Sequence, residues 1–104
     1  MIVTLIGIGS DSLADLFEAA GIDYVRHLPQ PGEDPSKAQM LEIRNYSVRT
    51  LAGILLDWLN EQPSRKVTVT RKDDSAWHAG GKSIAEVERL LDAAKSLIAI
   101  DMGE

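Results

Sequence analysis

The stretch from Ser47 to Lys72 constrains the fold more than any other part of this sequence, because it reads as a helix, a breaker and a strand in immediate succession. Leu51, Leu55 and Trp58 recur at the i, i+4, i+7 spacing that gathers apolar side chains on one helical face. A proline then stops the helix, and residues 67–70 alternate valine with threonine, the two-residue period of a half-buried strand. The stretch therefore predicts a largely buried amphipathic helix, capped by Ser47, and a strand with one inward face.

The composition fits one domain that spans residues 1–104. Of the 104 residues, 44% are hydrophobic and 26% are charged, which is typical of a single soluble globular domain with one modest core. The sequence has no apolar run of about 18 residues, and its apolar opening lacks the basic residues of an export signal. We therefore expect no membrane association and a cytoplasmic location. The absence of cysteine excludes disulfides and thiolate metal sites.

The N-terminal part predicts a strand, a helix and a second strand. Residues 2–8 form a nearly continuous apolar, β-branched run, which is typical of a central strand buried on both faces. The turn Gly7–Ser12 begins like a dinucleotide-binding motif, but Ser12 stands where the third glycine would be. We therefore favour a turn in which Asp11 or Ser12 caps the helix that follows. An amphipathic helix should then end at Gly21, and residues 22–28 should form the second strand.

The middle and the end of the chain predict three further strands around the central helix. The segment 29–36 holds three prolines and should be an exposed loop, followed by a strand at residues 39–44. Residues 65–72 and 76–79 should pair as a hairpin through a tight aspartate turn. We expect Trp77, on the second hairpin strand, to point inward or to cover a sheet edge.

The closing helix has the clearest start in the sequence. Ser83 and Glu86 have the spacing of a capping box, and apolar residues at helical spacing continue from Ile84 to Ile98. The predicted order of elements is β-α-β-β-α-β-β-α, whose first six match a ferredoxin-like sandwich. We therefore predict an α+β fold: a ferredoxin-like βαββαβ sandwich with an added β-α, in which the helices cover one face of the sheet.

Part of the chain resembles a known family. The run LAGILLDWLNEQPSRKVTVTRKDDSAWHAGGKSIAEVERLLDAA carries a helix with an L-x-x-W-L motif, a basic V-x-V strand, a turn and a closing helix. It resembles the second half of the effector-associated constant component domains of bacterial conflict systems, although Asp73 and Asp74 stand where a glycine is expected. The resemblance implies a small intracellular, non-enzymatic interaction module linked to toxins, effectors or defence systems. It transfers no catalytic residue.

A search of the sequence for chemistry yields no catalytic or cofactor-binding residue. His27 and His78 are its only histidines, and we expect them to be structural or surface residues rather than metal ligands. Arg65, Lys66, Arg71 and Lys72 could contact nucleic acid, but they lack interleaved aromatic residues in a protein of net charge −5. We expect a solvated strand end there instead. The sequence thus predicts no enzyme, no cofactor, no metal and no nucleic-acid partner.

The acidic residues suggest a protein partner. The first 34 residues hold six acidic residues against a single basic residue. Such a surface could capture a basic protein by electrostatic steering, and the residues we assign to it are Asp11, Asp15, Glu18, Asp23, Glu33 and Asp34. We expect a non-enzymatic, immunity-type inhibitor of a basic bacterial toxin. The alternative is an adaptor or signalling module that docks onto a larger effector, for which the apolar sheet face or Trp77 would matter more.

Overall fold

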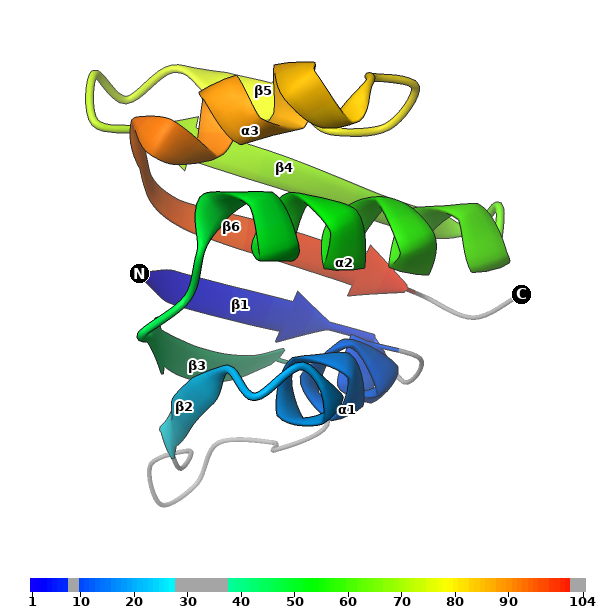
Figure 1. Ribbon diagram of the computed structural model, residues 1–104. Helices are drawn as coiled ribbons and strands as arrows, with labels where there is room; N and C mark the ends of the chain where they lie inside the picture. The colour runs from blue at the N-terminus through cyan, green and yellow to red at the C-terminus, as the bar shows by residue number, and fades with distance from the viewer. Residues whose placement is uncertain (8–9, 28–37, 102–104) are drawn as a thin grey trace.

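The computed structural model describes residues 1–7, 10–27 and 38–101, with Asp11 and Ala38 described through their backbone alone. This part of the chain forms three helices and six strands (Figure 1). Their order is β1 (Ile2–Ile6), α1 (Asp11–Ala19), β2 (Asp23–His27), β3 (Ala38–Arg44), α2 (Val48–Glu61), β4 (Arg65–Arg71), β5 (Ala76–His78), α3 (Ile84–Asp92) and β6 (Ala94–Asp101). The predicted α+β class is confirmed. The predicted loop at residues 29–36 lies outside the described residues.

All six strands form one mixed sheet with the order β2-β3-β1-β6-β4-β5. β1 and β6 are parallel and form the centre of the sheet, with Val3 beside Leu97. The other neighbouring pairs, including the predicted hairpin of β4 with β5, are antiparallel. β2 and β5 are therefore the two edges of the sheet.

The three helices lie on the same face of the sheet, which we call the covered face (Figure 1). In β1, β3, β4 and β6, every second side chain points to this face, and the apolar ones among them are buried. Together with the apolar stripes of the helices they form one core, to which the strands contribute Val3, Leu5, Leu41, Ile43, Val67, Val69, Leu97 and Ala99. The molecule thus has two layers, one of helices and one of strands.

α2 fills the middle of this core. Leu51, Leu55 and Trp58 are each 0% exposed, as their helical spacing predicts. Ser47 begins the helix, and its hydroxyl oxygen accepts a hydrogen bond from the backbone N–H of Thr50 at 3.0 Å. The predictions for this helix, for its cap and for the strand that follows it are confirmed.

The predicted capping box is present at the start of α3. The Ser83 hydroxyl accepts a hydrogen bond from the Glu86 backbone N–H at 3.3 Å, and the Glu86 carboxylate accepts one from the Ser83 backbone N–H at 3.1 Å. The second bond favours the ionised carboxylate and, with the Ser83 hydroxyl, holds the pKa of Glu86 below its usual value. The start of α3 is therefore fixed by its own side chains.

The expectation of one helix from Ile84 to Ile98 is wrong in its second half. α3 ends at Asp92, and the chain turns directly into β6. Leu97 and Ile98, which both fit helical spacing, point instead to opposite faces of the sheet. Pairing with β1 and β4 buries Leu97 and Ala99 completely, and this tertiary context overrides the local helical pattern.

A ferredoxin-like arrangement is not confirmed, because the sheet has more strands than that fold. A βαββαβ sandwich has four strands and pairs its first strand with its last. Here β6 lies between β1 and β4. The chain adds β5, α3 and β6 to the six-element motif, rather than the single β-α unit predicted.

Candidate functional site

The face of the sheet opposite the helices, which we call the open face, is apolar at its centre. Side chains of β1 and β6 point to it where they alternate with the buried core residues of the same strands. The register places Ile6 beside Ile100 and Thr4 beside Ile98. The neighbouring strands β2 and β3 extend this surface. We define the apolar strip as Ile2, Ile6, Val25, Met40, Ile98 and Ile100.

The apolar strip does not belong to the core. Its four isoleucines are only partly buried, and none of them is among the side chains that pack against the core in the described part of the chain. Val25 is 48% exposed and Met40 is 45% exposed. Central parallel strands that are apolar on both faces are typical of sheets covered on both sides. In the described residues, helices cover one side, so the strip is apolar surface that a partner could bury.

The charges on the open face balance each other. Glu42 lies 3.4 Å from the Arg44 guanidinium and 3.7 Å from the His27 ring nitrogen. Asp23 points to the same face on β2, and Lys66 points to it on β4. Apart from the histidines, the strands therefore place two acidic and two basic side chains here. In the described part of the chain the charges of this face therefore cancel, although the whole chain carries −5.

A buried polar cluster lies on the covered face, where β4 begins and β6 ends. Arg65 and Asp101 are neighbours across these strands, and Arg65 Nε donates a hydrogen bond to Asp101 Oδ2 at 2.9 Å. Their side chains are 9% and 6% exposed. Arg65 Nη1 also donates to Glu61 Oε2 at 2.9 Å, and the guanidinium lies over the Trp58 ring, 4.6 Å from its centre. The expectation that Arg65 belongs to a solvated strand end is therefore wrong.

Further hydrogen bonds tie this cluster to α1. Trp58 Nε1 donates to the Ser12 hydroxyl at 2.8 Å, and Arg65 Nη2 donates to the same oxygen at 3.3 Å. Burial alone would lower the pKa of Arg65, but its bonds to Asp101 and Glu61 outweigh burial and raise the pKa above its usual value. The cluster thus joins α1, α2, β4 and β6, and its polar groups form hydrogen bonds with one another.

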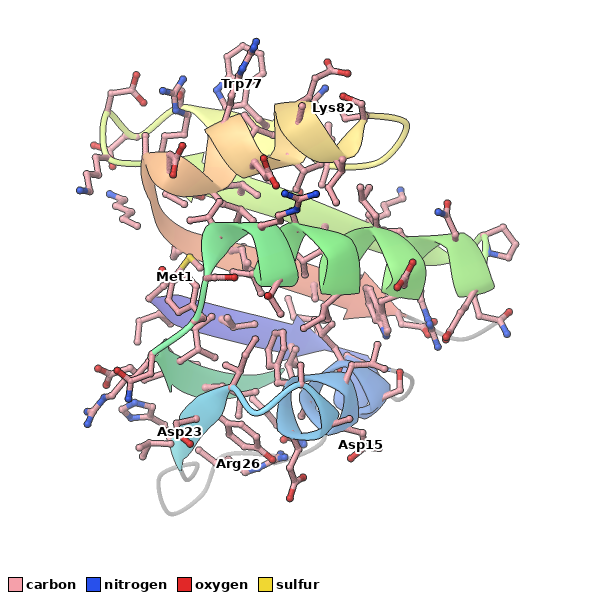
Figure 2. All side chains as sticks on the ribbon, viewed as in Figure 1. Met1, Asp15, Asp23, Arg26, Trp77 and Lys82 are labelled. Atoms are coloured by element: carbon pink, nitrogen blue, oxygen red, sulfur yellow. The ribbon has the colours of Figure 1, made fainter. Side chains whose placement is uncertain are left out.

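Three of the six predicted partner-binding residues can be placed. Asp15 and Glu18 are exposed on α1, and Asp23 is exposed at the start of β2; Figure 2 labels Asp15 and Asp23. The Tyr24 hydroxyl donates to Glu18 at 3.5 Å, which joins α1 to the β2 edge. Arg26, also exposed on β2, adds a positive charge there. Nothing is described of the side chains of Asp11, Glu33 and Asp34.

Trp77 lies at the opposite edge of the sheet, on β5. It is 45% exposed, so it does not point into the core (Figure 2). Its indole N–H donates to the Ser75 hydroxyl at 3.0 Å. The ring borders an open groove of about 410 Å³ that is also lined by Lys82, Glu86, Arg89 and Leu90. This groove mixes charges of both signs around one aromatic side chain.

The two histidines lie far apart in the sheet. His27 is on β2 and His78 is on β5, at the two edges of the sheet. Within the described ranges, no group of three or more His, Cys, Asp or Glu side chains could hold a metal ion. His78 instead lies within 3.2 Å of the Thr68 hydroxyl. It also borders a cleft of about 320 Å³, together with Leu59, Arg65, Lys66, Val67 and Gly80.

Comparison with known proteins yields no match. No family model matches this sequence, and neither does any curated protein or solved structure. Of the helices in the described residues, none has the length and apolarity needed to cross a membrane. Function is therefore inferred from the geometry of this chain alone.

Sequence reasoning does not find the two residues of the apolar strip that lie on β6. The helical spacing of the closing helix continues through Leu97 and Ile98, and it gives Ile100 no element. The signal was the alternation of residues 97–101, in which Leu97, Ala99 and Asp101 share one face. Two isoleucines on the other face give β6 the same two-sided apolar character as β1.

Proposed function

We propose that this protein is a non-enzymatic protein-binding module that docks through the open face of its sheet. The observation that carries the proposal is the apolar strip, which crosses the two central strands and lies outside the core. Exposed apolar patches of this kind mark interaction sites, because leaving them in water costs free energy. Of the two roles that the sequence allows, this observation favours the adaptor or signalling module that docks onto a larger effector in a conflict or defence system.

The free energy gained by burying the apolar strip supports a protein partner. Burying apolar surface contributes about 25 cal/mol per Å², so covering roughly 300 Å² of apolar surface contributes about 7 kcal/mol. Association costs offset much of that gain, and a broad contact is needed for a net affinity. A flat sheet face with half-exposed Val25 and Met40 at its side offers such a contact.

An immunity-type inhibitor of a basic toxin is the second candidate. It is supported by the exposure of Asp15, Glu18 and Asp23 on the α1 and β2 side of the molecule. Carboxylates there would speed the capture of a basic protein, and salt would weaken this effect. The inhibitor ranks second because the open face carries no net charge to attract such a partner.

The two candidates predict different sensitive residues. A tagged version of the protein is expressed in its native host cells. The proteins that co-purify with it are then compared between variants. Met40→Glu and Ile98→Glu place a charge in the apolar strip and should abolish capture. Ala85→Glu adds the same charge on the exposed outer side of α3 and is the matched control.

The double variant of Asp15 and Glu18 to alanine tests the inhibitor, because both residues are exposed on α1, away from the open face. Under the adaptor proposal it keeps its partner, because the open face is intact. If instead the double variant loses the partner while the two strip variants keep it, the acidic surface is the binding site. Association rates that fall with added salt only for the wild type would support the same conclusion.

A further inference from the structure

We infer that the occupant of the open face is a second copy of this chain, which stacks its own open face on the first. The inference rests on the proposed function, because it keeps the open face as the binding surface and names a second copy, in place of a larger effector, as the protein that covers it. Three properties of the face support it: its symmetry about the sheet centre, its charge and its area.

The register of the central strands makes the face self-complementary. Ile6 on β1 and Ile100 on β6 lie side by side, and so do Thr4 and Ile98. A two-fold axis that runs along the strands between β1 and β6 places β1 of each copy over β6 of the other. Ile6 of one copy then lies over Ile100 of the other, and both copies bury the same surface, as a closed dimer requires. Stacked sheets of this kind pack about 10 Å apart.

The charges of the face suit the same axis. β3 carries Glu42 and β4 carries Lys66, on opposite sides of the central pair. The register sets Glu42 level with Thr70 and Lys66 level with Ala38, so this axis brings each charge over an uncharged residue of the other copy. Because the charges of the described strands cancel on this face, stacking two copies does not concentrate the −5 charge of the chain at the contact.

The area of the face is close to what a specific dimer needs. The six strands hold 35 residues, and at about 3.3 Å per residue and about 4.8 Å between strands they span roughly 550 Å². That is about a tenth of the 6225 Å² surface of the molecule. Specific interfaces bury roughly 600–1,000 Å² on each partner, so the open face comes near the lower end of this range when all of it is used.

Sedimentation equilibrium of the purified chain tests the inference. The wild type should shift from its 11.4 kDa monomer to twice that mass as its concentration rises to about 200 µM. Ile98→Glu and Met40→Glu should raise the dissociation constant by about 100-fold or more, because each buries an unpaired charge. Ala85→Glu should behave as the wild type does. Met40 is 45% exposed, so its variant should stay folded, as far-UV circular dichroism can verify, even if Ile98→Glu does not.

The outcomes separate the inference from the proposed function. A wild type that stays monomeric at about 200 µM overturns the inference. A dimer whose dissociation constant neither strip variant raises also overturns the inference. If the monomeric wild type captures another protein and both strip variants lose it, the open face binds a different chain, and the proposed function stands alone. If neither the self-association of the chain nor the capture of another protein depends on the apolar strip, both the inference and the proposed function are wrong.

Discussion

Replacing Trp58 with alanine should remove the largest fully buried side chain of the core. Trp58 is 0% exposed, donates a hydrogen bond to Ser12 at 2.8 Å and lies under the Arg65 guanidinium. Truncating a buried tryptophan costs about 3–5 kcal/mol, and the lost stacking of a cation on the ring adds about 0.5–2 kcal/mol. A loss of about 5 kcal/mol is a large part of the roughly 5–15 kcal/mol expected for a domain of this size.

Urea denaturation followed by far-UV circular dichroism measures this loss without relying on tryptophan fluorescence. Trp77→Ala is the matched control, because Trp77 is 45% exposed and its removal should cost about 1 kcal/mol or less. Trp58→Phe keeps an aromatic ring under Arg65 but gives up the N–H bond, and should cost about 1–2 kcal/mol. Equal midpoints for Trp58→Ala and Trp77→Ala would refute the assignment of Trp58 to the centre of the core.

Three further predictions concern the polar groups that fix the fold. Among the described residues, Asp101→Ala leaves the buried Arg65 with Glu61 as its one acidic partner. We therefore expect a loss near the lower end of the roughly 3–5 kcal/mol for a broken buried pair, measured by urea unfolding. Ser83→Ala removes the cap of α3 and should lower the free energy of unfolding by about 1 kcal/mol in the same assay. The pKa of Glu86 is lowered in the folded state, so its contribution is present at neutral pH and is lost as the pH falls through the folded pKa. Thermal unfolding from about pH 6 to pH 3 should therefore show a steeper decline for the wild type than for Glu86→Gln; parallel curves would exclude this role.

Local patterns in the sequence were enough to place most elements. Ser47 and Ser83 mark helix starts through bonds made within one turn, and Leu51, Leu55 and Trp58 mark an inward helical face, so these features could be read without tertiary information. β6 could not be read in this way. Its residues continue a helical spacing, and they become a strand only because β1 and β4 offer two edges to pair with.

For the same reason, the candidate site could be predicted only in part from the sequence. The two-sided apolar character of β1 is visible in its composition, but the apolar strip exists only once β6 lies beside β1. The burial of Arg65 was equally hidden, because it depends on Asp101, which is distant in sequence and adjacent only through the pairing of β4 with β6. The sequence places Asp15 on a helix and Asp23 on the strand that follows, but it does not show that Asp23 points to the open face of the sheet.

The central place of β6 also determines how the chain can reach its folded state. The contact of Val3 with Leu97 closes a loop of nearly the whole described chain, and such long-range pairings slow folding. Until β6 inserts, β2-β3-β1 and β4-β5 are separate half-sheets, and β1 and β4 each expose an unpaired edge. We therefore expect slow refolding and a collapsed intermediate that is prone to aggregate. Removing residues 94–101 should leave no smaller stable domain, because both half-sheets lose the strand that joins them.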